Sequence, residues 1–267
     1  MPHSPSLNTI QALVIDMDGV LWRGATALPG LDNFFAFMRA NNIPFTLATN
    51  NASKTPQQYV QRFAGLGIEV FPDEVMTSAL ATAAYLKTQY PPGTKLYVVG
   101  QAGIRQALGN AGFVIAEENV AAVVAGIDFE LTYTKLKIAT LQINKGARFI
   151  GTNPDLTFPV EGDFAPGAGS ILAAISAATG KQPVVIGKPE PTLFEMALQR
   201  MKTSPARTAM IGDRLETDIL GAQRAGLKTI LVLSGVATPQ ALQASDIQPD
   251  WVFSGIKELV QAWEQNH

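Results

Sequence analysis

Short apolar runs alternate with segments of helical periodicity along almost the whole chain. The run Ala12–Ile15 predicts a buried strand near the N-terminus. Apolar side chains then recur at the spacing of one helix face, at Leu31, Phe34, Phe35 and Met38. The chain therefore starts as a strand followed by a helix.

The same alternation continues to the C-terminal region. Further strands are expected at 44–49, 96–99, 122–125, 148–150, 184–186, 208–211 and 229–233. Further helices are expected at 55–66, 104–110, 133–144, 192–201, 217–225 and 240–244. Repeated strand–helix units predict an α/β protein with a Rossmann-like, doubly wound parallel sheet that is covered on both faces.

The middle of the chain forms an alternating series of its own. A chain of 267 residues is longer than a typical domain of roughly 100–150 residues, which favours two domains. Gly/Pro-rich stretches lie at 90–93 and 164–169. We therefore expect an inserted α/β cap domain at 78–181, and a discontinuous core domain made of 1–77 and 182–267.

Composition removes several classes of function. The chain has 20 Lys+Arg and 22 Asp+Glu, with a net charge of −2, and no basic cluster of the kind that nucleic-acid binding requires. There is no Cys, which excludes disulfides and thiolate metal sites. The only histidines are His3 and His267, so catalysis by a Ser-His-Asp triad is not expected.

Neither a signal peptide nor a membrane span is expected. The start MPHSPSLNTIQ has no basic segment followed by an apolar run. The longest apolar stretch, around 120–127, is far below the roughly 20 residues of a membrane helix. These features predict a cytoplasmic protein that acts away from the membrane.

Four places just past predicted strands carry polar side chains suited to catalysis. In LVIDMDGVLW, Asp16 ends a strand and Asp18 follows two residues later; the alternative is an ordinary turn, which Asp also favours. In FTLATNNASK, the groups of Thr49 and Asn50 suit an anionic oxygen, although a plain helix-entry loop remains open. In VVIGKPEPT, Lys188 precedes a helix and could equally be a surface lysine.

The fourth place, AMIGDRLETDILGA, adds two more carboxylates. Asp213 follows a strand, and Asp218 lies in the first turn of the next helix, where the helix dipole alone could account for it. If the four places converge, the four Asp and Lys188 carry a summed charge of −3. A divalent cation would relieve this repulsion. All-oxygen ligation without His or Cys favours Mg²⁺.

In this order, the four motifs DxDGV, TN, GKP and GDxxxTD resemble the haloacid-dehalogenase (HAD) superfamily. The closest likeness is to its NagD-like, p-nitrophenyl phosphatase-like branch, in which an α/β cap is inserted between the second and third motifs. The flanking strings LPG, NNASKT, TNPD and PGAGS also resemble that branch. The resemblance covers nearly the whole chain and implies a HAD-like fold.

The resemblance also implies roles for individual residues. Asp16 would be the nucleophile that forms an aspartyl-phosphate, and Asp18 the acid and then the base. Thr49, Asn50, Asn51 and Lys188 would hold phosphoryl oxygens. Asp16, Asp213 and the main-chain carbonyl of Asp18 would bind Mg²⁺, and Asp218 would orient a metal-bound water. Homodimers formed through the cap are expected from the same resemblance.

Three residues keep two interpretations. Asn153 and Asp155 could reach the leaving group from the cap, although turn formation at Asn-Pro-Asp also accounts for them. Trp22 is expected to be a packing residue, with a place at the active-site entrance as the alternative.

The sequence thus predicts a Mg²⁺-dependent phosphomonoesterase acting on a small phosphorylated metabolite, of the sugar phosphate or nucleoside monophosphate class. One rival is a metal-independent dehalogenase of the same fold, which resistance to chelation would reveal. The other is a non-catalytic metabolite-binding or regulatory protein, which would bind phosphate esters without hydrolysing them.

Overall fold

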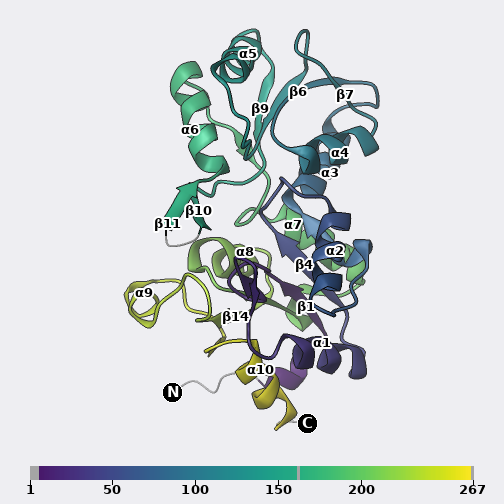
Figure 1. Ribbon diagram of the computed structural model, residues 1–267, viewed down its shortest axis with the longest axis vertical. Coiled ribbons are helices and arrows are strands. Elements are labelled where there is room, and N and C mark those ends of the chain that lie inside the picture. Colours follow the sequence, from purple (N-terminus) through teal and green to yellow (C-terminus); the bar gives the residue numbers. More distant parts are fainter. Residues whose placement is uncertain (1–5, 161–162, 266–267) are drawn as a thin grey trace. The chain divides into compact units, whose positions relative to one another are not determined.

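The computed structural model describes residues 6–160 and 163–265, which form two compact units (Figure 1). The first unit comprises Met1–Thr49, Val60–Met76 and Phe194–His267, and the second comprises Asn50–Tyr59 and Thr77–Leu193. The predicted cap segment 78–181 lies wholly within the second unit. That unit also contains 50–59 and 182–193, so several candidate site residues belong to it. The division into catalytic core and cap remains a prediction.

The first unit is organised by a six-stranded sheet in the order β15-β14-β13-β1-β4-β5. The central strand β1 pairs in parallel with β13 and β4, and β14 pairs in parallel with β13 and β15. The strands are β1 (Ala12–Ile15), β4 (Phe45–Thr49), β5 (Val75–Thr77), β13 (Thr208–Gly212), β14 (Lys228–Val232) and β15 (Trp251–Phe253). Every residue of β1, β4 and β13 is buried, which explains why these strands are mainly apolar and show no alternation of polar positions.

Helices and short elements accompany this sheet along the chain. The helices are α1 (Leu31–Ala40), α2 (Pro56–Gly65), α7 (Thr192–Met201), α8 (Leu220–Arg224), α9 (Pro239–Ala244) and α10 (Ile256–Glu264). Short 3₁₀ turns occur at Leu7–Thr9, Pro72–Glu74 and Pro205–Arg207, and β2 (Trp22–Arg23) pairs with β3 (Thr26–Ala27) as a small hairpin. Helices α1 and α10 pack together, with the rings of Phe37 and Trp263 5.7 Å apart.

The helix after β13 begins differently from the prediction. One helix was expected over 217–225, whereas the structure has a π-helical turn at Leu215–Ile219 that leads into α8. The backbone N–H groups of Asp218 and Ile219 both donate to the carbonyl of Arg214, at 3.1 and 3.2 Å. This widened turn is a feature often found at functional sites.

The second unit contains a parallel five-stranded sheet in the order β12-β9-β8-β6-β7. Its strands are β6 (Lys95–Val99), β7 (Val114–Ile115), β8 (Ala122–Ala125), β9 (Arg148–Gly151) and β12 (Val184–Val185). Helices α5 (Tyr133–Asn144) and α6 (Ala168–Thr179) lie on one side of this sheet, and α3 (Ser78–Gln89) and α4 (Ala102–Asn110) lie on the other (Figure 1). A hairpin of β10 (Thr157–Val160) and β11 (Asp163–Pro166) contacts α6.

The sequence did not reveal helix α3, strand β7 or the β10–β11 hairpin of this unit. Helix α3 has the sequence SALATAAYLKTQ, in which small residues surround the helix and hide the period that marks one apolar face. The β10–β11 hairpin was also not anticipated, although the Gly/Pro-rich stretch at 164–169 forms its second strand and the entry into α6.

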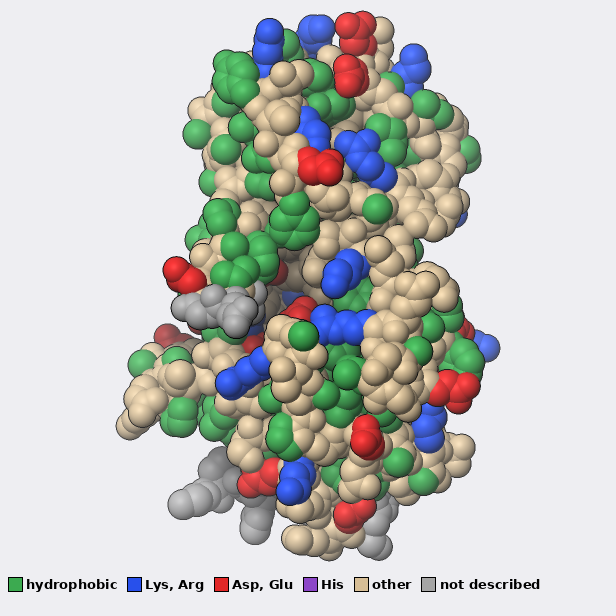
Figure 2. All heavy atoms as spheres, in the orientation of Figure 1, with side chains coloured by type: hydrophobic (Ala, Val, Ile, Leu, Met, Phe, Trp, Pro, Cys, Tyr) green, Lys and Arg blue, Asp and Glu red, His purple; other side chains and the backbone are tan. Residues whose placement is uncertain are grey.

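Charge is dispersed over the surface. On the face drawn in Figure 2, Lys and Arg side chains are interspersed with Asp and Glu over each unit. Among the described residues, no helix has the length and apolar character needed to span a bilayer.

Candidate active site

Three carboxylates meet at the carboxyl edge of the first unit's sheet. Asp16 follows β1 and Asp213 follows β13, and these strands are parallel neighbours. Together with Asp218, each offers a carboxylate oxygen, and the three oxygens lie within 4.8 Å of one another. All three residues are buried, with exposed fractions of 8 %, 1 % and 1 %. The convergence expected from the sequence is therefore present for these three.

The loop after β14 encloses the Asp213 side chain. Oδ2 of Asp213 accepts the backbone N–H of Val236 at 2.8 Å, and the main-chain carbonyl of Asp213 accepts the N–H of Ala237 at 2.9 Å. A Cβ on Gly19 or on Gly235 would come within 2.2 or 1.9 Å of Asp213 Oδ2. Gly19 also has a positive φ of 86°, so glycine is required there for both space and backbone conformation.

Asp218 organises the loop that carries Asp213. Its Oδ2 accepts the backbone N–H groups of Asp213 and Arg214, at 3.2 and 3.1 Å. The π-helical turn brings the carboxylate back towards the strand end to make these bonds. The helix-dipole explanation of Asp218 is thus incomplete, because the side chain also fixes the geometry of Asp213.

The Asp18 carboxylate lies outside the three-carboxylate cluster. Asp18 is exposed, and its Oδ1 accepts the indole N–H of Trp22 at 2.8 Å. The predicted contribution of Asp18 to metal binding is through its main-chain carbonyl, and that remains a prediction. Trp22 itself has an exposed fraction of 0 %, so it is a buried packing residue and does not line an entrance.

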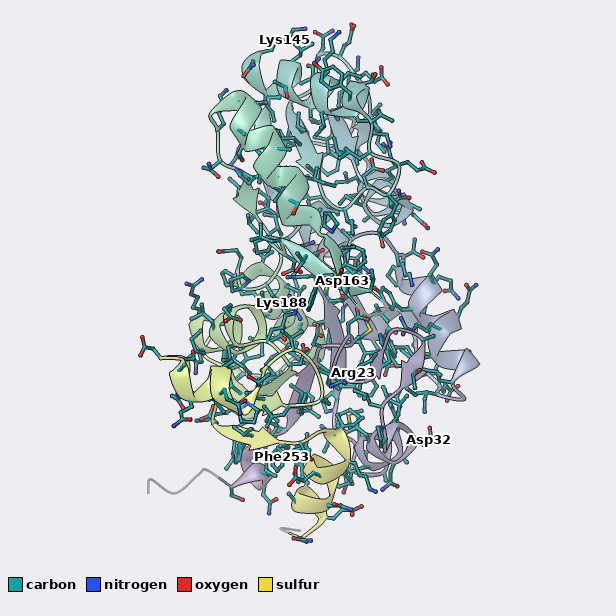
Figure 3. All side chains as sticks on the ribbon, turned by 60° about the vertical axis from the view of Figure 1, so that its left-hand side comes forward. Arg23, Asp32, Lys145, Asp163, Lys188 and Phe253 are labelled. Atoms are coloured by element: carbon teal, nitrogen blue, oxygen red, sulfur yellow. The ribbon has the colours of Figure 1, made fainter. Side chains whose placement is uncertain are left out.

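Ser234 and Arg23 help to fix the loops around the carboxylates, and neither residue was expected at the site from the sequence. Ser234 Oγ donates to the carbonyl of Gly19 at 2.7 Å, and Arg23 Nε donates to the carbonyl of Ser234 at 2.6 Å. Arg23 extends from β2 (Figure 3). These bonds therefore connect the loop that contains Asp18 and Gly19 to the loop after β14, which encloses the Asp213 side chain. The sequence could have indicated Ser234, because Ser234 and Gly235 follow the end of β14, which is the neighbour of β13.

The three-carboxylate cluster suits a hard divalent cation. Three buried anions at this spacing repel one another, and a cation between them would remove that cost. The oxygen-only donor set matches Mg²⁺ better than zinc or copper. The residues present therefore fit the metal that the sequence predicts.

The remaining predicted site residues fall in the second unit, except for Thr49. Thr49 is the last residue of β4 and is buried. Asn50 follows it, and its Nδ2 donates to the carbonyl of Lys188 at 2.9 Å and to Asp155 Oδ2 at 3.2 Å. The Asn50 carbonyl accepts Asn153 Nδ2 at 2.7 Å. Within this unit, Asn50, Asn153, Asp155 and Lys188 thus form a second polar cluster.

Local turns account for part of this second cluster. The backbone N–H of Asp155 donates to Asn153 Oδ1 at 3.1 Å, which is the turn expected at Asn-Pro-Asp. Asn51 Oδ1 likewise accepts the N–H and the hydroxyl of Ser53, at 2.9 and 2.7 Å. The turn expected at Asn153 and Asp155 is therefore present, and both residues also bond to Asn50; a contact of either residue with a leaving group stays a prediction.

Lys188 is a buried lysine and not a surface one. It follows β12 and Gly187 (Figure 3), and its exposed fraction is 2 %. The backbone N–H of Gly187 donates to the carbonyl of Thr152 at 2.9 Å, and a Cβ at Gly187 would lie 2.6 Å from Asn50 Oδ1. Glycine therefore allows the segment before Lys188 to pack closely against Asn50.

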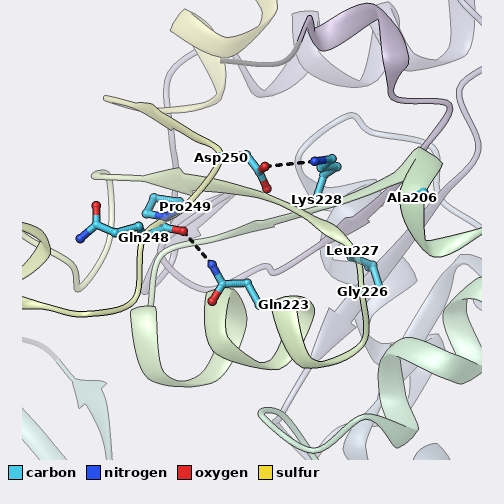
Figure 4. A pocket seen from close by; sticks show the side chains of 8 residues that line it. All are labelled: Ala206, Gln223, Gly226, Leu227, Lys228, Gln248, Pro249 and Asp250. Carbon is cyan, nitrogen blue, oxygen red and sulfur yellow. Dashed lines mark hydrogen bonds and ion pairs between the residues drawn. The ribbon is translucent and has the colours of Figure 1, made fainter. Parts of the chain in front are cut away.

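A separate open pocket of about 410 Å³ lies at the other edge of the first unit's sheet. It is lined by Ala206, Gln223, Gly226, Leu227, Lys228, Gln248, Pro249 and Asp250 (Figure 4). These residues precede or begin β13, β14 and β15, whereas Asp213 follows β13. Lys228 pairs with Asp250 at 3.3 Å, and the pocket has no part in the carboxylate cluster.

Comparison with known proteins supports a family assignment. The model of the haloacid dehalogenase-like hydrolases matches residues 13–114, and a HAD-hydrolase-like model matches residues 185–259. An acid sugar phosphatase of Staphylococcus epidermidis is 40 % identical over 96 % of this chain and 98 % of its own length.

Two solved structures share the fold. NagD from Escherichia coli K-12 matches with a TM-score of 0.86 and 36 % identity, over 93 % of this chain and 98 % of its own. A glycerol phosphate phosphatase from Mycobacterium tuberculosis, solved in complex with magnesium, matches with a TM-score of 0.88 and 31 % identity, over 94 % of this chain and 76 % of its own. With its sheet topology, its ordered motifs and these relatives, the chain belongs to the haloacid dehalogenase-like hydrolases, in the NagD-like branch of phosphatases.

Proposed function

We propose that the protein is a Mg²⁺-dependent phosphomonoesterase that hydrolyses a small phosphorylated metabolite through an aspartyl-phosphate on Asp16. The observation that carries the proposal is the meeting of Asp16, Asp213 and Asp218 at one sheet edge. The names of the relatives favour a sugar phosphate or a related polyol phosphate as substrate, and a nucleoside monophosphate is the alternative within the same class.

The first chemical step uses the two aspartates of the DxD motif. An oxygen of Asp16 attacks phosphorus, so a P–O bond to the enzyme forms while the bond to the leaving alkoxide breaks. Asp18 gives its proton to the leaving oxygen. Asp18 then takes a proton from water, whose oxygen attacks the same phosphorus, and this releases phosphate and regenerates the Asp16 carboxylate.

The proposed metal ligands are Asp16, Asp213 and the main-chain carbonyl of Asp18, with Asp218 orienting the loop. The bound cation would offset the charge of the carboxylates and of the phosphoryl oxygens. Asp213 arrives already oriented, because Val236 N–H and the Asp218 carboxylate fix its loop. This pre-organisation reduces what must reorder when the metal binds.

Phosphate binding is assigned to Thr49, Asn50, Asn51 and Lys188. Asn50 uses its Nδ2 to hold Asp155 and the Lys188 carbonyl, so its contribution to phosphate binding is assigned to its backbone N–H. Asn51 uses its side-chain oxygen in the turn with Ser53, so its contribution is also assigned to the backbone. Lys188 supplies the positive charge, and Asn153 and Asp155 are assigned to the leaving group.

The central test is phosphate release by the wild-type protein and by Asp16→Asn, with Mg²⁺ present. Asp16→Asn should lower turnover of 4-nitrophenyl phosphate by at least about a thousandfold, because the nucleophile is lost. Asp32→Asn is the matched control, since Asp32 is an exposed carboxylate in the first turn of α1. Activity retained by Asp16→Asn would reject the proposal. Activity that survives EDTA would reject the metal requirement and favour a metal-independent hydrolase.

Dimerisation through the second unit is proposed separately. Large hydrophobic side chains are exposed on this unit, namely Phe129, Leu131, Tyr133, Leu156 and Phe164. The ring of Phe129 also lies 6.0 Å from that of Phe158. Sedimentation equilibrium of the wild type and of Phe129→Ser tests this, because a dimer that uses this surface should dissociate more readily in the variant. A monomeric wild type would reject it.

A further inference from the structure

We propose that Trp22 is a positioning residue for Asp18, holding its carboxylate in the orientation needed to protonate the leaving group. The proposal rests on the function proposed above, and it adds a role in catalysis to the packing role of this tryptophan. Trp22 is one of the largest fully buried side chains. Its only polar side-chain atom donates to Asp18 Oδ1 at 2.8 Å.

The backbone of this loop places the two side chains together. The N–H groups of Val20 and Leu21 both donate to the carbonyl of Met17, at 3.3 and 2.9 Å. The N–H of Gly19 then donates to the carbonyl of Trp22 at 2.8 Å. This tight turn brings the backbone of Trp22 back beside Asp18, where the indole N–H donates to the carboxylate.

Two residues of α2, Arg62 and Phe63, contact the indole ring of Trp22. The ring of Phe63 packs against it with centroids 4.9 Å apart, at an angle of 58°. The guanidinium carbon of Arg62 lies 3.8 Å from the ring centroid, and Arg62 also donates to the carbonyl of Gly24. A cation over an aromatic face is favourable when partly removed from water. The ring is therefore a fixed donor, while the aspartate it holds is exposed.

A fixed donor matters because Asp18 must present its other oxygen to the leaving group. An exposed aspartate that rotated freely would spend little time in the reactive orientation, and poor orientation lowers the rate of proton transfer. The Trp22 bond holds Oδ1, so in this proposal Oδ2 is the oxygen presented to the leaving group. A purely structural tryptophan would support the fold without favouring either oxygen of Asp18.

The test compares kcat/KM for two esters, because kcat/KM reports the step in which the leaving group departs. An alkyl phosphate such as glycerol 3-phosphate needs protonation of its leaving oxygen. In 4-nitrophenyl phosphate the leaving group departs as a stable anion, and protonation contributes little. Trp22→Phe keeps a buried aromatic ring and removes the N–H. It should lower kcat/KM about tenfold or more for the alkyl ester, and about threefold or less for the aryl ester.

Two further variants sharpen the comparison. Trp263→Phe is the matched control, since Trp263 is equally buried, at 1 %, and packs against Phe37 in α1; it should show no difference between the esters. In the Asp18→Asn background, Trp22→Phe should cost nothing further on the alkyl ester, because the group it positions has lost its acidic function.

The possible results separate the inference from the proposed function. If the wild type hydrolyses neither ester, the proposed function fails and the inference fails with it. If the wild type hydrolyses both and Trp22→Phe loses equally on both, the inference alone is overturned. Should Trp22→Phe not fold, as judged by circular dichroism, Arg62→Gln decides. Arg62→Gln removes the guanidinium that lies over the indole ring and leaves Trp22 itself unchanged. It should lower kcat/KM selectively for the alkyl ester. Equal losses on both esters would overturn the proposal.

Discussion

The two polar clusters of this protein are built on opposite plans. In the first unit, Asp16, Asp213 and Asp218 bring three negative charges together, and the carboxylates of Asp213 and Asp218 accept backbone N–H groups from loops at strand ends. In the second unit, Asn50 connects three chain segments by donating side-chain hydrogen bonds to Asp155 and to the Lys188 carbonyl. The first cluster gathers negative charge, whereas the second is held together mainly by side-chain hydrogen bonds.

The difference shows what each cluster requires from outside. Carboxylates gathered at a sheet edge are stable together only if a counter-charge arrives, so the first cluster is suited to a cation. The second contains its own lysine and is held together by side-chain hydrogen bonds from Asn50 and Asn153, so it is suited to shaping a pocket. Substitutions in the first should therefore change metal dependence, and substitutions in the second should change substrate affinity.

The largest effect is expected from Asp213→Asn. Loss of one of the three carboxylates should lower Mg²⁺-dependent hydrolysis by at least about a hundredfold, because even outer-shell changes at metal sites cost about 10–100-fold. Phosphate release at saturating Mg²⁺ measures it, with Asp32→Asn as control. Activity within a few-fold of wild type would remove Asp213 from the metal site.

A smaller effect is expected from Asp218→Asn. The amide oxygen can still accept the N–H groups of Asp213 and Arg214, but the negative charge is gone. The concentration of Mg²⁺ that gives half-maximal activity should rise by about tenfold, with a modest change in kcat. If kcat falls as far as in Asp213→Asn while Mg²⁺ dependence is unchanged, Asp218 has a direct chemical role instead.

Asn50→Ala tests whether the two clusters act independently. It removes the bonds to Asp155 and Lys188, and should raise KM by about tenfold, in keeping with the roughly 1–3 kcal/mol cost of leaving buried partners unpaired. The Mg²⁺ dependence should stay as in the wild type. A parallel shift in Mg²⁺ dependence would show that the clusters are not separable. Asn144→Ala is the matched control, since Asn144 is an exposed asparagine at the end of α5.

The smallest effect concerns a carboxylate that belongs to neither cluster and accepts a backbone N–H. Glu258 of α10 accepts the N–H and the hydroxyl of Ser254, at 2.6 and 2.7 Å, and these bonds lower the pKa of Glu258. A lowered folded-state pKa adds stability at neutral pH that is lost as the pH falls through that pKa. The melting temperature of Glu258→Gln should be slightly below that of the wild type at pH 7, and the two should converge near pH 3. A gap that widens on acidification would contradict this.

The carboxylate cluster could be predicted from the sequence because it depends on strand ends. Asp16 and Asp213 each follow a continuous apolar run, and the carboxyl ends of neighbouring parallel strands meet by geometry. The resemblance to the NagD-like branch then implied that these residues share one metal site, whereas the order of the strands in the sheet came from the structure. The same logic could have found Ser234 and Gly235, which follow the next strand, but neither is a residue type that suggests catalysis by itself.

The contacts that depend on tertiary structure could not be predicted. No local pattern indicates that Asn50 reaches Asp155, which is 105 residues away. Helix α3 lacks an apolar face, so its period is invisible in the sequence. The π-helical turn before α8 arises because Asp218 returns to the strand end, and a helical pattern cannot show this. Trp22 was expected to pack, and only the structure reveals its bond to Asp18.

Isothermal titration of Mg²⁺ into the wild-type protein and into Asp213→Asn tests the central claim most directly. If the three carboxylates form a metal site, the wild type should bind Mg²⁺ at a single site, and the variant should lose about tenfold or more in affinity. Asp32→Asn should bind as the wild type does. Equal Mg²⁺ binding by the wild type and Asp213→Asn, or none by either, would contradict the assignment of this sheet edge as a metal site.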